Sequence, residues 1–162
     1  MIVIADSSPL IVLVNIQCVD LLPLLFKRIL IPPAVARELL HPRRPSAVRN
    51  YFQTPPSWLQ VQSPTLHRVF PFLHAGETEA LNLVVELHAN AILVDERKAT
   101  QAAAALNVEV IGTIGILERA ARQGAVNLQD AFDKLKQTDF WISHALLDQR
   151  LALFRAKQSP PS

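Results

Sequence analysis

The chain has 162 residues, half of them hydrophobic, and a formal net charge of only +2. This length suits one domain with a substantial buried core, and no stretch reaches the ~20 apolar residues that cross a bilayer, which excludes a membrane-spanning segment. Its single cysteine, Cys18, excludes an internal disulfide.

The opening stretch, MIVIADSSPL, has no cationic lead-in and reaches an acid at Asp6, so it does not resemble a signal peptide. We therefore expect a cytoplasmic protein. Short, branched, apolar runs predict buried strands, and 3.6-residue periodicity predicts helices. The predicted strands are residues 2–6, 29–32, 91–95 and 108–113. The predicted helices are residues 9–16, 20–26, 33–40, 76–89, 96–106, 114–123, 128–137 and 141–156. This alternation predicts an α/β fold with three αβα layers, in which helices cover both faces of a parallel sheet of four to five strands.

The segment 41–75 fits the alternation least well, because it holds six of the 12 prolines. It predicts an insertion or an edge element, with a short helix around 46–53 and an extended piece at 58–62. We expect a single domain over residues 1–157 and a frayed tail at 158–162. The last predicted helix presents a broad apolar face, which predicts a homodimer through that helix. The residues of this face are Phe140, Trp141, Leu147, Leu151 and Phe154.

Two predicted strands end in an aspartate, Asp6 and Asp95. Ligands bind outside the carboxyl ends of parallel strands, so both side chains should emerge at one edge of the sheet. The alternative role is helix capping, which aspartate favours. Ser8 and Pro9 already supply a cap and a first helical residue, which weakens that alternative for Asp6. The capping alternative remains open for Asp95, because a helix is predicted to begin directly after this residue.

Three glutamates extend this set at predicted helix positions. On a helical wheel Glu77 points toward the core and Glu79 borders the same stripe, both in the first turn, where the alternative role is to favour the helix dipole. Glu38 flanks the buried face of its helix, whereas Arg37 points away, and a solvated surface glutamate is the alternative for Glu38. Carboxylates that converge on one edge raise one another's pKa unless a cation neutralises them. Oxygen ligands without nearby His or Cys favour Mg²⁺ or Mn²⁺.

The distribution of charge also bears on the partner. If these five acids gather at one site, the other nine face 16 Lys and Arg, which leaves +7 over the rest of the molecule. An acidic pocket on a basic body suits a cation in the pocket and a polyanion on the surface. Arg43, Arg44 and Arg49 in the proline-rich segment are candidates to hold phosphates, with an ordinary solvated loop as the alternative.

The motifs IVIADSSPLI, IPPAVAREL, GETEAL, AILVDERKA and GTIGIL, in this order, resemble the PIN-domain ribonucleases, and most closely their compact bacterial and archaeal branch. The similarity runs from residue 2 to about 124, with a looser echo in FWIS. The resemblance implies a Mg²⁺- or Mn²⁺-dependent endoribonuclease, often the toxin of a VapC-type toxin–antitoxin pair and often a homodimer, with RNA as the substrate and an antitoxin protein as a partner. It carries the four acids onto Asp6, Glu38, Glu79 and Asp95, with Glu77 as a fifth, and it makes Ser7 and Thr113 small polar residues that line the site. The chain departs from the pattern at Glu96, where relatives commonly have Asp, and at Thr100, which replaces a frequent Arg.

Other functions compete with this one. A receiver-like phosphoacceptor domain would need paired acids at the end of the first strand, and a haloacid-dehalogenase-type phosphatase would need an Asp where Ser8 stands. The remaining alternative is a PIN fold that binds a small partner protein without catalysing a reaction.

Overall fold

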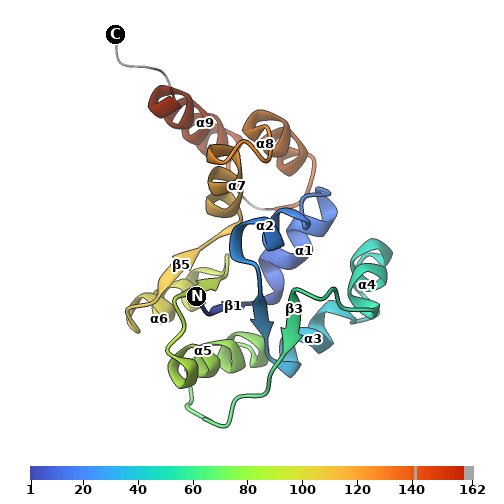
Figure 1. The fold of residues 1–162 in the computed structure, drawn as a ribbon, viewed down its shortest axis with the longest axis vertical. Coiled ribbons are helices and arrows are strands. Elements are labelled where there is room, and N and C mark those ends of the chain that lie inside the picture. The colour runs from blue at the N-terminus through green and yellow to red at the C-terminus, as the bar shows by residue number, and fades with distance from the viewer. Residues whose placement is uncertain (141, 159–162) are drawn as a thin grey trace.

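A computed structural model describes residues 1–140 and 142–158. These residues form one five-stranded sheet in the order β3-β2-β1-β4-β5, and every pair of neighbouring strands is parallel (Figure 1). The strands are β1 (Val3–Ala5), β2 (Ile29–Ile31), β3 (Leu59–Val61), β4 (Ala91–Leu93) and β5 (Glu109–Ile111). The predicted α/β fold with a central parallel sheet is confirmed. Strand β3 is the extended piece predicted at 58–62, and it lies at an edge of the sheet, as expected.

Helices follow the strands in the predicted order. They are α1 (Ser7–Asn15), α2 (Leu21–Phe26), α3 (Pro33–Leu39), α4 (Ser46–Gln53), α5 (Ala75–Leu87), α6 (Arg97–Ala104), α7 (Thr113–Arg122), α8 (Leu128–Lys136) and α9 (His144–Gln158). Residues 62–74, between β3 and α5, form no helix or strand. Within the described parts of the chain, no helix has the length and apolar character that crossing a bilayer requires.

The two faces of the sheet are covered by different helices, because successive side chains of a strand point to opposite sides. Val3, Ala5 and the residues in register with them, Ala91 and Leu93, belong to a large core with α1 to α4 and α7 to α9. Ile4 and its register partner Ile92 belong to a second core with α5 and α6. This is the three-layer arrangement seen in Figure 1, with α5 and α6 on one side and α1 and α7 on the other.

The strand order places a topological switch point at the centre of the sheet. From β1 the chain first builds β2 and β3 on one side, then crosses to build β4 and β5 on the other. The loops that leave β1 and β4 therefore diverge, and such a switch point is where open parallel sheets bind ligands. Asp6 follows β1 directly, and Asp95 lies two residues beyond β4.

Two predicted helix starts are wrong, and both concern these aspartates. Helix α1 begins at Ser7, so Asp6 rather than Ser8 takes the N-cap position, and Pro9 falls within the first turn. Proline is tolerated throughout the first turn, because the backbone N–H groups of that turn have no intrahelical partner. Helix α6 begins at Arg97, and Glu96, not Asp95, is its N-cap residue and accepts a hydrogen bond from the Ala99 N–H at 2.8 Å. Asp95 is therefore not a cap residue, and Asp6 occupies a cap position without making a side-chain capping bond.

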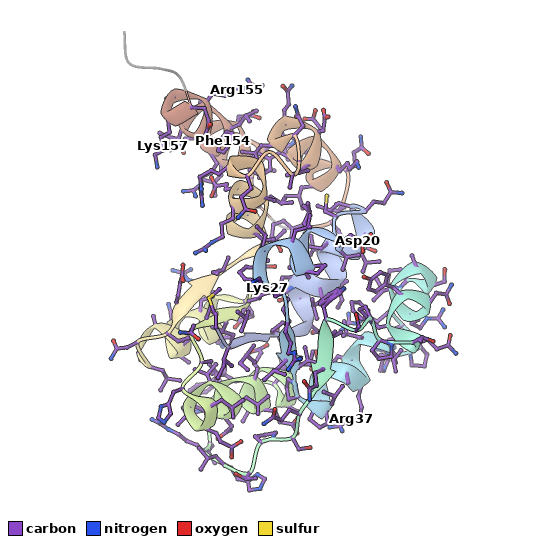
Figure 2. All side chains as sticks on the ribbon, in the orientation of Figure 1. Asp20, Lys27, Arg37, Phe154, Arg155 and Lys157 are labelled. Atoms are coloured by element: carbon purple, nitrogen blue, oxygen red, sulfur yellow. The ribbon has the colours of Figure 1, made fainter. Side chains whose placement is uncertain are left out.

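The C-terminal helix does not expose the surface on which the predicted homodimer was based. Leu147 is fully buried, and Phe140, Leu151 and Phe154 are partly buried against the same core. Phe154 lies near the far end of α9 (Figure 2). Trp141 and residues 159–162 of the expected tail lie outside the described residues, whereas Gln158 is the last residue of α9. The homodimer itself stays a prediction.

Candidate active site

Asp6 is held at the end of the central strand by one hydrogen bond to β4 and one from the first turn of α1. Its backbone N–H donates to the Leu93 carbonyl at 2.9 Å, and its carboxylate accepts a 3.1 Å bond from the Ser8 hydroxyl. Although Asp6 takes the N-cap position of α1, its side chain makes no capping bond, and the residue is only 4% exposed. Burial raises the pKa of the Asp6 carboxyl, the Glu38 charge raises it further, and the nearby N–H groups of Ser7 and Ser8 partly offset this. The Asp6 carboxylate is thus buried, and no cationic side chain among the described residues pairs with it.

Glu38 lies beside Asp6 because α3 turns its side chain inward. Arg37, labelled in Figure 2, is exposed on the same helix. Glu38 is half-buried, as the helical wheel predicted. The Ser7 hydroxyl donates to the Glu38 carboxylate, so the solvated alternative for Glu38 is wrong. Gly76 closes this pair from α5, because a Cβ atom there would lie 3.0 Å from the Glu38 Cδ and closer still to Oε1. Glycine therefore lets the first turn of α5 approach the acid.

Glu77 adds a third carboxylate from the first turn of α5, and it is only 8% exposed. Burial is the main cause that raises the pKa of Glu77 to about 7, and the charges of Asp6, Glu96 and Glu38 raise it further. His74, the residue before α5, lowers it in part. Glu77 therefore shares an electrostatic environment with both other acids.

Glu79 has a different position from Glu77. Its carboxylate accepts a 2.8 Å hydrogen bond from the Ala34 N–H, near the start of α3, where the N-cap residue Pro32 makes no side-chain cap. Glu79 is also not among the charges that shift the pKa of Asp6 or Glu77. The hydrogen bond from Ala34 to Glu79 fixes α3 against α5, the helix that carries Glu79.

Asp95 is clamped by the first residue of α7. Thr113 donates to its two carboxylate oxygens, from the backbone N–H at 2.7 Å and from the hydroxyl at 2.6 Å. Burial raises the pKa of Asp95, and the two bonds from Thr113 lower it. Gly112 makes the approach feasible, because a Cβ atom at that position would lie 2.9 Å from the Asp95 Oδ1. The backbone N–H of Asp95 meets the Ser8 hydroxyl at 3.4 Å, which links this loop to the one that carries Asp6.

The structure thus brings Asp6, Glu38 and Glu77 within electrostatic reach, with Ser7 bonded to Glu38. Asp95 lies on the adjoining loop, where Thr113 at the start of α7 binds it. Glu96, Ser8 and His74 contact or act on these acids but were not among the predicted site residues. Glu96 follows Asp95 directly, at a position where the resemblance leads one to expect Asp, and an acid at that position is the signal that could have included it.

Comparison with known proteins agrees with this geometry. A protein-family profile described as a PIN domain matches residues 2–156. The chain belongs to the PIN-domain family. No curated protein and no solved structure gave a significant match. PIN domains are of nuclease type and typically use divalent metals, so the family accounts for a cluster of carboxylates at the switch point of the sheet.

The donor set of this PIN domain fits a hard divalent cation in its chemistry. Carboxylate and hydroxyl oxygens are the ligands that Mg²⁺ and Mn²⁺ prefer, and the raised pKa values of Asp6 and Glu77 reflect buried negative charge that a cation would relieve. The set is not drawn together, because within residues 1–140 and 142–158 no three His, Cys, Asp or Glu side chains are grouped closely enough to hold a metal.

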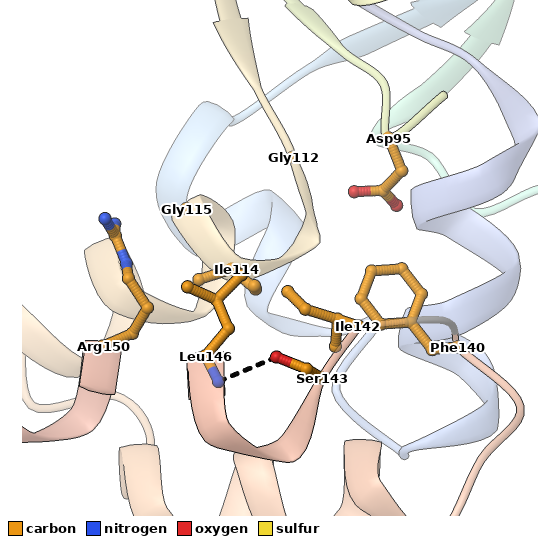
Figure 3. A pocket seen from close by; sticks show the side chains of 9 residues that line it. All are labelled: Asp95, Gly112, Ile114, Gly115, Phe140, Ile142, Ser143, Leu146 and Arg150. Atoms are coloured by element: carbon orange, nitrogen blue, oxygen red, sulfur yellow. Dashed lines mark hydrogen bonds between the residues drawn. The ribbon is translucent and has the colours of Figure 1, made fainter. Parts of the chain in front are cut away.

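A pocket of about 660 Å³ adjoins Asp95 in this PIN domain (Figure 3). Figure 3 shows the Asp95 carboxylate above the Phe140 ring and the Ile142 side chain, with Arg150 at the opposite end. The lining residues are Asp95, Gly112, Ile114, Gly115, Phe140, Ile142, Ser143, Leu146 and Arg150. Arg150 is paired with the buried Glu118, so the pocket is mainly apolar between one acid and one neutralised cation.

The three predicted RNA-contacting arginines differ in their contacts. The Arg44 guanidinium donates to the Glu38 carbonyl at 3.1 Å, at the end of α3, and Arg49 donates to the Arg44 carbonyl at 3.1 Å. Arg43 is exposed. Arg44 and Arg49 therefore stabilise the segment after α3 through hydrogen bonds to backbone carbonyls. An ordinary solvated loop would not have such contacts.

Proposed function

We propose that this PIN domain is a divalent-metal-dependent endoribonuclease whose site is formed by Asp6, Glu38, Glu77 and Asp95. The observation that carries the proposal is the burial of Glu77 next to other acids, which raises its pKa to about 7. Buried carboxylates without a cationic partner destabilise a fold, so their retention together favours a functional role. RNA is the proposed substrate, because it is a polyanion that the basic remainder of the surface would attract.

The residues would divide the work as their contacts suggest. Asp6, Glu38, Glu77 and Asp95 would hold Mg²⁺ or Mn²⁺, while the Ser7 hydroxyl orients Glu38 and Thr113 orients Asp95. When bound, the ion would supply Lewis-acid chemistry that activates a water and offsets negative charge at the scissile phosphate. Glu79, assigned to the metal by resemblance, would instead hold α3 in place through Ala34.

The test is cleavage of a mixed RNA pool by the purified protein with Mn²⁺ or Mg²⁺, in parallel with chelator and with Asp6→Asn protein. We expect cleavage only by the unaltered protein in the presence of the ion. Cleavage that survives chelator would refute the metal, and equal cleavage by Asp6→Asn would refute the site.

The biological setting extends this proposal. The resemblance to VapC-type proteins supports a toxin that a small antitoxin protein restrains, and a homodimer in the cytoplasm. Expression of the chain should then arrest growth, and Asp6→Asn should relieve the arrest. Light scattering at micromolar concentration tests the dimer.

A second candidate is a PIN fold that binds a small partner protein and catalyses nothing. Two observations favour it: the acids of the described residues are not grouped as a metal site, and an apolar pocket adjoins Asp95. The pocket volume lies in the range of ligand sites. Absence of cleavage with any divalent ion, together with unaltered melting when Mn²⁺ is added, would favour this candidate over the nuclease.

A further inference from the structure

The segment between β3 and α5, residues 62–74, exposes large apolar side chains. Phe72 is 86% exposed and Val69 is 80% exposed, the two highest values among the large hydrophobic residues described. Burying a phenylalanine normally stabilises a protein, so a phenylalanine held in water is informative when the segment around it is ordered.

Contacts on both sides of Phe72 hold the segment in place. The buried Asn82 side chain accepts from the Arg68 N–H at 2.8 Å and donates to the Arg68 carbonyl at 2.9 Å. Phe70 and Leu73 pack against the core beneath α5 and α6. The residues around Phe72 are therefore anchored, while its own ring faces outward.

The backbone of Phe72 is unusual as well. Its φ is +68°, in the left-handed region that glycine and asparagine adopt most readily. Among the described non-glycine residues with positive φ, Phe72 alone has an apolar side chain. A position selected for local stability alone would favour glycine or asparagine over an aromatic residue.

The Phe72 ring lies beside the start of α6. Lys98 Nζ lies over the ring, 5.5 Å from its centroid. Lys98 is in the first turn of α6, two residues after Glu96, and His74 at the start of α5 acts on Glu77. Phe72 therefore stands where the N-terminal ends of α5 and α6 meet, close to the acids that they carry.

The stretch of chain that contains the segment is basic in sequence, although the Glu86 carboxylate accepts hydrogen bonds from Thr65 within the segment. The 38 residues from Leu39 to Gly76 contain no Asp or Glu, but they contain four Arg and three His. In Figure 1 this stretch runs from α4 through β3 and along the chain that enters α5. An exposed aromatic ring beside a lysine is a combination that holds single-stranded nucleic acid, by base stacking and by a phosphate contact.

We propose that Phe72 is a stacking platform for an unpaired base of the RNA substrate, and that Lys98 contacts an adjacent phosphate. This inference rests on the proposed ribonuclease function and names two residues that hold the RNA. Stacking needs an exposed base face, which a duplex does not offer, so duplex RNA should not use the platform.

The test is binding of a short unstructured oligoribonucleotide and of its duplex, by fluorescence anisotropy in chelator over a series of salt concentrations. Phe72→Ala should weaken single-strand binding about 5- to 100-fold. Its salt slope and its duplex binding should match those of the unaltered protein. Phe72→Trp should retain binding, and Val69→Ala is the matched control on the same segment. Lys98→Ala should instead reduce the salt slope by about one.

Three results would overturn the inference. They are equal binding by Phe72→Ala and Val69→Ala, a change of salt slope in Phe72→Ala, and a change of oligomeric state in Phe72→Ala, which would assign the ring to a second copy of the chain. Melting curves check that each variant is folded. Cleavage with Mn²⁺ is measured on the same preparations: if the unaltered protein cleaves RNA, any of these results refutes the platform alone. If the unaltered protein cleaves RNA but does not bind the single strand in chelator, only the platform is refuted. If it shows no binding and no cleavage, the proposed function is refuted as well.

Discussion

Thr113 and Asp95 are joined by two hydrogen bonds, of 2.7 Å from the backbone N–H and 2.6 Å from the hydroxyl. Thr113 is fully buried, so Thr113→Val keeps the shape and the N–H bond but leaves one carboxylate oxygen without its donor. We expect a loss of stability of roughly 1–3 kcal/mol and a fall in cleavage activity. Thr113→Ser, which keeps the hydroxyl, should retain most of both. Equal behaviour of the two variants in urea unfolding would mean that the hydroxyl bond has no energetic role.

Asp6→Asn separates a structural role from a functional one by the sign of the stability change. Asp6 is buried near Glu38 and Glu77, so removing its charge should stabilise the metal-free protein. Unaltered protein should gain stability from saturating Mn²⁺ and the variant should gain little. Melting curves with chelator and with Mn²⁺ measure both effects. A variant that melts like the unaltered protein in both conditions and still cleaves RNA would remove Asp6 from the site.

The pKa of Glu77, raised to about 7, predicts a pH-dependent stability. A carboxyl whose pKa is higher in the folded state favours folding while protonated, so this contribution is full below the unfolded value of about 4.5 and is lost as pH rises toward 7. In chelator, Glu77→Gln should therefore be more stable than the unaltered protein at about pH 8, by on the order of 1–3 kcal/mol, and similar to it at about pH 4. Parallel unfolding curves across that range would contradict the assignment.

Gly76→Ala should be harmful although alanine favours helices by ~1 kcal/mol. The added methyl group would overlap the Glu38 carboxylate, so we expect lower stability and lower activity. The same substitution in a Glu38→Ala background should be neutral or stabilising, because the overlap is gone. A double-mutant cycle measures this coupling, and additive effects would show that Gly76 does not approach Glu38. Gly115→Ala in α7, where the new atom would contact only the Ile111 Cγ2 at 3.3 Å, is the control for a helical glycine.

Arg43 and Arg44 should respond differently to replacement by alanine. Arg43 is exposed, so its loss should flatten the salt dependence of RNA binding by about one unit of slope without lowering stability. Arg44 donates to the Glu38 carbonyl, so its loss should cost about 1 kcal/mol of stability. Salt titrations and melting curves of the two single variants test the division. An unchanged slope in Arg43→Ala would leave that residue as a solvated side chain.

Local patterns predicted the parts of the fold that depend on short-range physics. Apolar runs and helical periodicity located the strands, and parallel topology placed Asp6 and Asp95 at one edge. One error was local: a serine before a proline is a common helix start, yet α1 begins at Ser7, two residues before the predicted start at Pro9. The other errors came from contacts distant in sequence.

The glutamates show the same limit. The helical wheel predicted that Glu77 points toward the core, but only the position of α3 shows that Glu79 meets Ala34. Likewise Asp95 is excluded from capping because Thr113, 18 residues later, binds its carboxylate, which leaves the cap to Glu96.

The strand order has a further consequence for how the protein is made. Ile4 of the central strand pairs with Leu30 on one side but with Ile92 on the other, and Asp95 meets its donor only at Thr113. During synthesis, one edge of β1 therefore has no partner until β4 has left the ribosome, and a chain that stops before α7 lacks the clamp on Asp95. Pairings this distant in sequence form late and slow folding. A truncated or nascent chain would carry the first acids in an unassembled state, so the competent centre should arise in a single late step and should be absent from every shorter fragment.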